Sequence, residues 1–362
     1  MSTGAEPDAP LRGLRVLELA TLYAAPQIGA MLGDLGADVV KVEPPAGDPM
    51  RRMGVVRDGV SRNWSWVARH KRSIALDLAA ASDRATFSGL IERADVLVEN
   101  LTAAVRARWG CRFDELHVLN PSLVVASVSC YGLTGPYADR PGAGTLAEAF
   151  GGLADLTGEP DGPPMLASAP LGDTLTAFSG VIGALAGCWS RERGGAGRLV
   201  DVTMYEPVLA ILGGTIAGYD PADPPRRSGS RVRGGAPRNV YRTRDARYVA
   251  VSGTTDPQVA RLLPLLGCDG PADRARFSAG ADRLGHADAL DRLVASWIAE
   301  RDLDSVLTAF LGARIPIAPV NDVGALLEDE HVVARASLAP MMEAHGPMLD
   351  GDRAAVLSDW LG

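Results

Sequence analysis

Asp173 is the side chain best placed in this sequence for covalent chemistry. It stands between a proline-containing apolar segment, residues 165–172, and an apolar run, residues 174–189, that predicts a buried helix. An aspartate where a loop enters a helix usually caps the first backbone N–H groups. A carboxylate in that place can instead attack an acyl group, with the same N–H groups stabilising the charge that develops. The local sequence leaves both roles open.

The other reactive side chains do not form a metal or disulfide pattern. The four cysteines lie far apart, without the paired spacing of a zinc site or a disulfide framework. The five histidines make no HExxH or HxxxH pattern. The segment after the first predicted strand, residues 20–26, lacks the GxGxxG pattern of dinucleotide-binding turns. We therefore expect no bound metal and no dinucleotide cofactor.

Composition limits the classes of partner and the compartment. A chain of 362 residues is long for one domain, and its apolar fraction of 47% is ample for a sizeable core. A net charge of -8 argues against a nucleic-acid or anionic membrane surface. No apolar run reaches the roughly 18 residues of a membrane span, and the short acidic start is unlike a signal peptide. These features predict a soluble cytoplasmic protein.

Strand and helix patterns alternate along the first half of the chain. Short β-branched runs predict strands, and stretches with helical periodicity lie between them. This alternation predicts an α/β fold, in which helices cover both faces of a mostly parallel sheet and ligands bind at the carboxyl ends of its strands. The predicted strands are residues 14–19, 38–43, 73–78, 95–99, 123–129 and 199–204, and the predicted helices are 26–35, 81–94, 102–108 and 174–189.

The second half predicts a smaller domain. Residues 221–235 are polar and rich in proline and glycine, which is typical of a linker. Residues 236–311 carry a predicted strand at 248–252 and three predicted helices, so we expect a small α/β domain there. The extended segment 315–320 is interpreted as a return to the first domain. The large Rossmann-like domain would then comprise residues 1–220 together with 312–362.

Six further segments, taken in order, resemble one family. They are GADVVKVEPP (36–45), HKRSIALDL (70–78), ADVLVEN (94–100), YGLTGPY (131–137), LGDT (171–174) and GRLVDVTMYE (197–206). Together they resemble the class III coenzyme A transferases, the family of formyl-CoA and carnitine CoA-transferases that also contains α-methylacyl-CoA racemase. The resemblance extends from about residue 11 to residue 335. It implies an interlocked homodimer in which each ring-like chain threads through the other.

The resemblance also implies a reaction. The aspartate that matches Asp173 attacks an acyl-CoA thioester, which gives a mixed anhydride and free CoA thiolate. The thiolate returns to form an aspartyl-CoA thioester, and a second carboxylic acid then takes the CoA. The substrates implied are therefore an acyl-CoA and a carboxylic acid, and coenzyme A is carried between them without a metal.

Residues that would hold coenzyme A follow from the matching positions. The basic segment at residues 70–72, directly before the predicted strand at 73–78, would surround the adenine and the 3′-phosphate. The segment after the strand at 95–99 would lie beside it. An arginine beyond the second strand could face the diphosphate. The matching residues are His70, Lys71, Arg72, Asn100, Leu101, Arg108 and Arg51.

Two further side chains are candidates near the reacting groups. Tyr23 stands where formyl-CoA transferase has a glutamine, so its phenol could hydrogen-bond an acyl oxygen or could simply pack. The racemase branch has a Gly-His-Asp segment after the YGxxGP motif, whereas this chain has PGAGT at residues 141–145. The acid nearest to that gap is Glu148, and without the histidine a racemase would lack one of its two bases.

Three functions therefore remain from the sequence. A CoA-transferase is favoured, an α-methylacyl-CoA racemase or epimerase is disfavoured, and a non-catalytic CoA-binding protein is the third. The loop around residues 231–238 is unusually basic, because it holds Arg231, Arg233 and Arg238. These arginines would suit an anionic acyl group, but they would equally suit a solvated loop.

Overall fold

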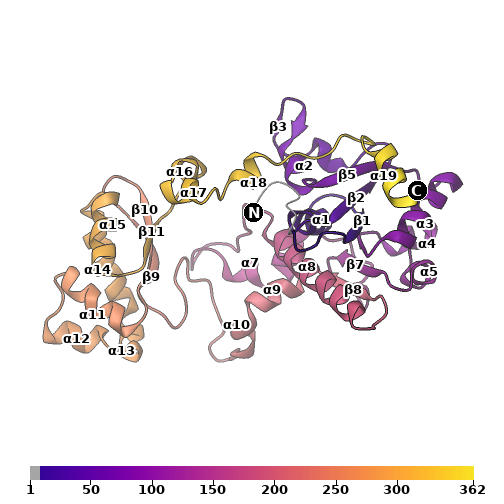
Figure 1. The fold of residues 1–362 in the computed structure, drawn as a ribbon. Coiled ribbons are helices and arrows are strands. Elements are labelled where there is room, and N and C mark those ends of the chain that lie inside the picture. Colours follow the sequence, from indigo (N-terminus) through magenta and orange to yellow (C-terminus); the bar gives the residue numbers. More distant parts are fainter. Residues whose placement is uncertain (1–8) are drawn as a thin grey trace. The chain divides into compact units, whose positions relative to one another are not determined.

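A six-stranded parallel sheet forms the centre of the larger part of the molecule (Figure 1). This computed structural model describes residues 9–362. The strand order is β5-β2-β1-β6-β7-β8, and every neighbouring pair is parallel. This is the order of a doubly wound Rossmann fold, in which the direction of winding reverses between β1 and β6. The strands are β1 (Arg15–Leu19), β2 (Asp38–Glu43), β5 (Lys71–Ala75), β6 (Val96–Glu99), β7 (Val124–Ser129) and β8 (Leu199–Thr203).

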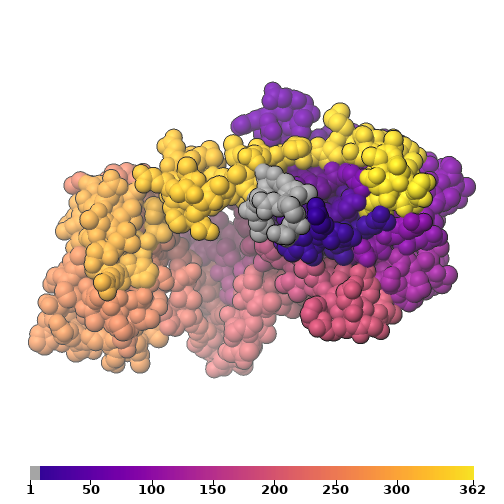
Figure 2. Space-filling view, in the orientation of Figure 1, coloured from indigo at the N-terminus to yellow at the C-terminus, as the bar shows by residue number. Residues whose placement is uncertain are grey.

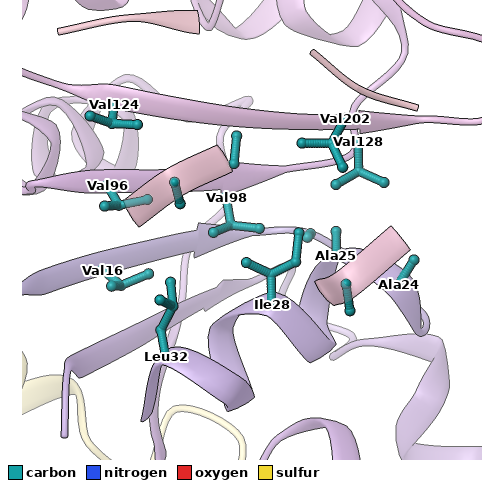
Figure 3. Packing of buried hydrophobic residues seen from close by; sticks show 14 of the residues in the cluster. Val16, Ala24, Ala25, Ile28, Leu32, Val96, Val98, Val124, Val128 and Val202 are labelled. Carbon is teal, nitrogen blue, oxygen red and sulfur yellow. The ribbon is translucent and has the colours of Figure 1, made fainter. Parts of the chain in front are cut away.

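Helices cover both faces of this sheet, as predicted. On one face α1 (Ala24–Asp34) and α8 (Leu171–Glu192) pack on a cluster of buried valine, isoleucine, leucine and alanine residues. Figure 3 shows Ile28 of α1 close to Val98 of β6 within this cluster. The other face is covered by α3 (Ala81–Arg93), α5 (Phe113–Leu119) and α19 (Arg353–Leu361). The predicted α/β class with a mostly parallel sheet is confirmed.

Helix α8 lies close to its neighbours because small residues line its buried face. A Cβ added to Gly180 would stand 2.2 Å from Cδ1 of Ile28, and one added to Gly187 would stand 2.6 Å from Cγ1 of Val124. Among the described residues, α8 is also the one helix long and apolar enough to cross a membrane by length and composition. Its contacts with α1 and the sheet make it a core helix of this part of the chain.

Shorter elements connect the layers. A hairpin and two small helices lie between β2 and β5, one helix follows β6, several helices flank α8 in the sequence, and one precedes α19. They are η1 (Pro49–Arg52), β3 (Val56–Arg57), β4 (Val60–Ser61), α2 (Arg62–Val67), α4 (Ala103–Trp109), α6 (Gly144–Phe150), α7 (Leu153–Leu156), α9 (Glu206–Ile211), α10 (Gly213–Ala217) and α18 (Ala339–Met342).

A second compact unit has its own sheet and core. Its three antiparallel strands have the order β11-β10-β9, and buried residues of the sheet and its helices form a separate hydrophobic cluster. The strands are β9 (Arg238–Arg242), β10 (Tyr248–Ser252) and β11 (Ile317–Pro319). The helices are α11 (Asp256–Leu265), α12 (Pro271–Phe277), α13 (Gly280–Gly285), α14 (Ala287–Ala299), α15 (Leu303–Gly312), α16 (Val323–Glu328) and α17 (Glu330–Ala334).

The division into units differs from the predicted one. The second unit comprises Asp155–Met165 and Asp220–Ser337, and the remaining described residues form the first. The segment 315–320, interpreted from the sequence as a return to the first domain, instead supplies β11 to the small sheet. The reason is that Ile317–Pro319 pairs with β10 through backbone hydrogen bonds, which no sequence pattern specifies. The chain re-enters the first unit at Leu338.

The C-terminal helix α19 seals one face of the large sheet. Figure 2 shows the yellow C-terminal residues lying on the surface of the first unit. Trp360 is 1% exposed and packs in the cluster beneath α19. Its indole Nε1–H donates to Oδ2 of Asp38 at 2.8 Å, and the guanidinium of Arg15 lies 5.4 Å from the centroid of its ring. The last turn of the chain is therefore tied to the amino ends of β1 and β2.

We expect Trp360→Ala to lower the free energy of unfolding by about 3–5 kcal/mol, because it removes a buried aromatic side chain and leaves a cavity. Urea denaturation followed by circular dichroism measures this loss. Val118→Ala is the matched control, since Val118 is 82% exposed. An unfolding free energy for Trp360→Ala equal to that of the control would contradict this account of α19.

Candidate active site

Asp173 lies inside the first turn of α8 and not at its cap. The helix begins at Leu171, and the N-cap position is held by Pro170, whose side chain makes no capping hydrogen bond. Asp173 therefore does not have the N-cap role that the sequence left open for it. Its carboxylate accepts a hydrogen bond from its own backbone N–H. It remains beside the positive end of the helix, where negative charge is stabilised.

Glu148 of α6 caps part of the N-terminus of α8. This side chain is 1% exposed, and its Oε1 accepts from the backbone N–H of Gly172 at 3.0 Å. Its Oε2 accepts from the N–H of Ala167 at 3.2 Å. One donor in the first turn of α8 and one in the loop before it are thus satisfied by a carboxylate from another helix. Burial raises the pKa of Asp173, and the negative charge of Glu148 raises it further.

Gly144 makes room for the carboxylate of Asp173. A Cβ added to Gly144 would stand 2.2 Å from Oδ2 of Asp173, and one added to Gly172 would stand 2.3 Å from the carbonyl oxygen of Gly144. The starts of α6 and α8 therefore meet backbone to backbone. This contact explains why position 144 holds no acid or histidine, because a side chain there would occupy the place of the Asp173 carboxylate.

Tyr23 lies within electrostatic reach of Asp173. It follows β1 and occupies the N-cap position of α1. Burial raises the pKa of its phenol, the charge of Asp173 adds to that rise, and a hydrogen bond from Trp66 opposes it. A phenol can both donate and accept a hydrogen bond, so the Tyr23 hydroxyl can serve as a donor.

The sequence did not reveal Trp66 or Cys130 as neighbours of this site. Trp66 lies on α2, and the guanidinium of Arg69 stacks 3.8 Å from the centroid of its ring. The Cys130 thiol follows β7; burial raises its pKa, and Asp173 contributes to the rise. A tryptophan on a short helix and a lone cysteine carry no spacing that would have marked either one as close to Asp173.

Asn100 and Leu101 lie at the point where the winding of the sheet reverses. They follow β6, and the side-chain amide of Asn100 bridges to the end of β1. Its Oδ1 accepts from the N–H of Thr21 at 3.1 Å, and its Nδ2 donates to the carbonyl of Thr21 at 2.9 Å. The N–H of Leu101 donates to Oε2 of Glu99 at 2.6 Å. Ligands of doubly wound sheets bind in the crevice outside such strand ends.

Three residues of the predicted adenine and phosphate site lie at the start of β5 and are engaged in pairs. Nε2 of His70 lies 3.2 Å from a carboxylate oxygen of Asp34. The side chain of Lys71 is fully buried against Glu18, and burial lowers its pKa to about 8. Arg72 pairs with Asp38 and Asp359.

The two remaining predicted cations differ from each other. Arg51 donates two hydrogen bonds to Glu43, at 2.8 and 2.6 Å, and a third to the carbonyl of Pro347. Arg108 is exposed on α4 and lies 5.4 Å from the ring centroid of Trp109. Within residues 9–362 no carboxylate forms an ion pair with it. Arg108 is therefore available to an anionic group, whereas Arg51 is held by Glu43.

The basic loop of the second unit is largely neutralised. Arg231 pairs with Asp288 and Asp291, and Arg233 pairs with Asp223. These contacts favour the structural interpretation of the loop over an anion-binding one. In the part of the chain that the structure describes, no group of three or more histidine, cysteine, aspartate or glutamate side chains is arranged to hold a metal ion.

Comparisons with known proteins agree with one another. Residues 11–359 match the model of CoA-transferase family III. A succinyl-CoA–D-citramalate CoA-transferase from Chloroflexus aurantiacus is 36% identical over 335 residues, which cover 92% of this chain and 83% of that protein. A succinate–glutarate CoA-transferase from Agrobacterium fabrum is 32% identical, with coverage of 96% and 89%. The crystal structure of a CAIB/BAIF family protein from Brucella suis has a TM-score of 0.85 and 29% identity, and the match covers 97% of this chain and 99% of that one.

We expect Glu148→Gln to lower the pKa of Asp173, because the substitution removes a neighbouring negative charge while the aspartate stays buried. Titration of carbon-13-labelled carboxyl groups by NMR measures the change, with Asp173→Asn assigning the signal. Glu192→Gln, at the other end of α8, is the control and should leave that pKa unchanged. An unchanged or higher pKa in Glu148→Gln would show that the two carboxylates do not interact.

Proposed function

The chain belongs to CoA-transferase family III, and from this premise we propose that it transfers coenzyme A through covalent intermediates on Asp173. The enzyme moves CoA from an acyl-CoA to a carboxylic acid. The observation that supports the mechanism is the position of the Asp173 carboxylate in the first turn of α8. Glu148 accepts the N–H of Gly172, and Gly144 leaves space for the carboxylate of Asp173.

The proposed reaction has four balanced steps. A carboxylate oxygen of Asp173 attacks the thioester carbonyl, and the carbon–sulfur bond breaks to give a mixed anhydride and CoA thiolate. The thiolate attacks the aspartyl carbonyl and releases the donor acid, leaving an aspartyl-CoA thioester. The acceptor carboxylate attacks that thioester, giving a new anhydride and thiolate. The thiolate then attacks the acceptor carbonyl, which releases the new acyl-CoA and restores Asp173.

Neighbouring groups support each attack. The raised pKa of Asp173, which follows from burial and from Glu148, makes its carboxylate a stronger nucleophile once ionised. The Tyr23 hydroxyl, which lies within electrostatic reach of Asp173, can donate to the oxyanion that forms on the acyl carbon. Glu148 does not touch the reacting atoms, so we assign it as a positioning residue.

We propose that CoA lies across the carboxyl ends of β1 and β6. Asn100 and Leu101 would flank it there, and Arg108 would bind a phosphate. Lys71 and Arg72 pair with carboxylates, which supports a role for these two cations in the fold of the protein.

The acids exchanged are proposed to be dicarboxylates. The relatives from Chloroflexus and Agrobacterium are named for succinyl-CoA with D-citramalate and for succinate with glutarate, all of which derive from dicarboxylic acids. A racemase would need a base in residues 141–145, and a side chain at Gly144 would collide with Asp173. The packing therefore argues against that alternative.

Asp173→Ala is expected to lower CoA transfer by roughly 10⁴-fold or more, the scale on which loss of a nucleophile acts. Succinyl-CoA is the donor, and mono- and dicarboxylic acids are compared as acceptors. In the unaltered protein, hydroxylamine or borohydride should trap an adduct that mass spectrometry locates at Asp173. Asp114→Asn, a change at an exposed carboxylate, is the control. Full activity of Asp173→Ala would falsify the mechanism, and transfer to monocarboxylates alone would overturn the acid class.

We further propose that the protein is a homodimer. Helix α8 carries an exposed apolar stripe at helical spacing, formed by Phe178, Ile182 and Trp189 at 53%, 68% and 63% exposure. Exposed apolar side chains also lie on α6, at Leu146 and Phe150. A stripe of this kind is typical of a surface that a second protein chain covers.

Ile182→Arg should convert the dimer to a monomer, because it places a charge in the middle of the stripe. Sedimentation velocity gives the mass of the species in solution. Val118→Arg on α5 adds the same charge at another exposed position and should leave the mass unchanged. A wild-type protein that sediments as a monomer, or an Ile182→Arg variant that remains dimeric, would rule out this interface.

A further inference from the structure

Four charged side chains that the proposed reaction does not use are buried together beneath the loop after β1. They are Glu18 of β1, Lys41 of β2, Lys71 of β5 and Asp48, and none of these side chains is exposed to solvent. Nζ of Lys41 lies 2.8 Å from Glu18 and 2.9 Å from Asp48, and Nζ of Lys71 lies 2.6 Å from Glu18. Two carboxylates therefore balance two ammonium groups. We call these four residues the buried charge cluster.

The buried charge cluster holds the backbone of the loop at three places. Nζ of Lys41 donates to the carbonyl of Ala20 at 2.7 Å, and Nζ of Lys71 donates to the carbonyl of Pro26 at 2.6 Å. Oδ1 of Asp48 accepts from the N–H of Leu22 at 3.3 Å. These ties come from β2, from β5 and from the turn after β2. They fix both ends and the middle of residues 20–26.

The loop needs such support because its conformation is an unfavourable one. Leu22 has φ of 70°, in the left-handed region that a residue with a Cβ rarely adopts. Tyr23 follows at once, so the direction of its side chain depends on how Leu22 is held. Helix α1 also rests directly on the cluster, since a Cβ added to Gly29 would stand 2.1 Å from Oε2 of Glu18.

We propose that Lys71 is a positioning residue, which holds the start of α1 through Glu18 and the Pro26 carbonyl so that Tyr23 keeps its place within electrostatic reach of Asp173. The proposal rests on the function proposed above for Tyr23. A merely structural cluster would contribute only to stability, and buried ion pairs often contribute little to stability compared with apolar residues of the same size. The ties to the loop give this cluster a second role, because they set the geometry of a residue that contacts the acyl group.

A double-mutant cycle tests the proposal. Lys71→Met removes the ammonium group but keeps a long side chain. We expect it to lower kcat for CoA transfer by about 10-fold or more, because small displacements of a catalytic group have effects of this size. KM for the acyl-CoA should stay within about 2-fold. In a Tyr23→Phe background, Lys71→Met should change kcat by less than about 2-fold, since interacting residues are not additive.

A second variant separates positioning from stability. Glu18→Gln combined with Lys71→Met leaves Lys41 paired with Asp48, so the cluster is again neutral. We expect the melting temperature to recover relative to Lys71→Met alone, while kcat stays low because the Pro26 carbonyl has lost its donor. Recovery of kcat together with the melting temperature would overturn the proposal, as would an equal loss in the Tyr23→Phe background.

A matched control removes an ion pair elsewhere in the same unit. Arg191 pairs with Asp95 at 2.9 Å near the end of α8, about 27 Å along the helix from Asp173. Arg191→Met should lower the melting temperature without changing kcat. The trapped adduct on Asp173 is measured independently of kcat in the Lys71 variants. The proposal that Asp173 is the nucleophile and the proposal that Lys71 positions Tyr23 can therefore fail separately. If Tyr23→Phe leaves kcat unchanged while Asp173→Ala is inactive, the positioning proposal fails and the nucleophile stands.

Discussion

The hydrogen bond that Glu148 accepts from the N–H of Gly172, at the start of α8, is the interaction on which the rest of the site depends. The first turn of a helix has backbone N–H groups without partners, and an aspartate in that turn would normally satisfy them. Here the carboxylate of Glu148, on a different helix, accepts the N–H of Gly172. Asp173 is therefore left near the positive end of the helix with oxygen atoms available for reaction. The close contact of Gly144 with Asp173 then fixes where that carboxylate lies.

The topology of the sheet brings the other parts of the site to the same edge. β1 and β6 are neighbouring parallel strands, so the loop that follows β1 and the segment that follows β6 lie at the same edge of the sheet. Asn100 joins them through two hydrogen bonds to Thr21. Tyr23 lies two residues further along that loop, within reach of the charge of Asp173. The reactive groups therefore come from segments that are far apart in the sequence and are united by the order of the strands.

Several of the basic residues expected to bind a ligand form ion pairs within the fold. Lys71 and Arg72 are paired with carboxylates on β1, on β2 and on α19, and Arg51 is paired with Glu43. A buried cation without a partner would be costly, so each is matched by an acid. Arg108 is exposed without such a partner among the described residues. Exposure and pairing, which a sequence does not display, distinguish cations that bind ligands from cations that hold strands together.

The sequence by itself determined the family, the α/β class and most of the elements, because these depend on local patterns of apolar residues. The strand at Asp38–Glu43 was predicted to the residue, and the match to CoA-transferase family III over residues 11–359 confirms the resemblance. The strand predicted at 73–78 instead runs from Lys71 to Ala75, because its first two residues are charged and only their partners make burial possible. Tertiary structure alone decided that Asp173 is not a cap and that Ile317–Pro319 joins the small sheet. Both depend on partners distant in the sequence, whose hydrogen bonds form only once the chain has folded.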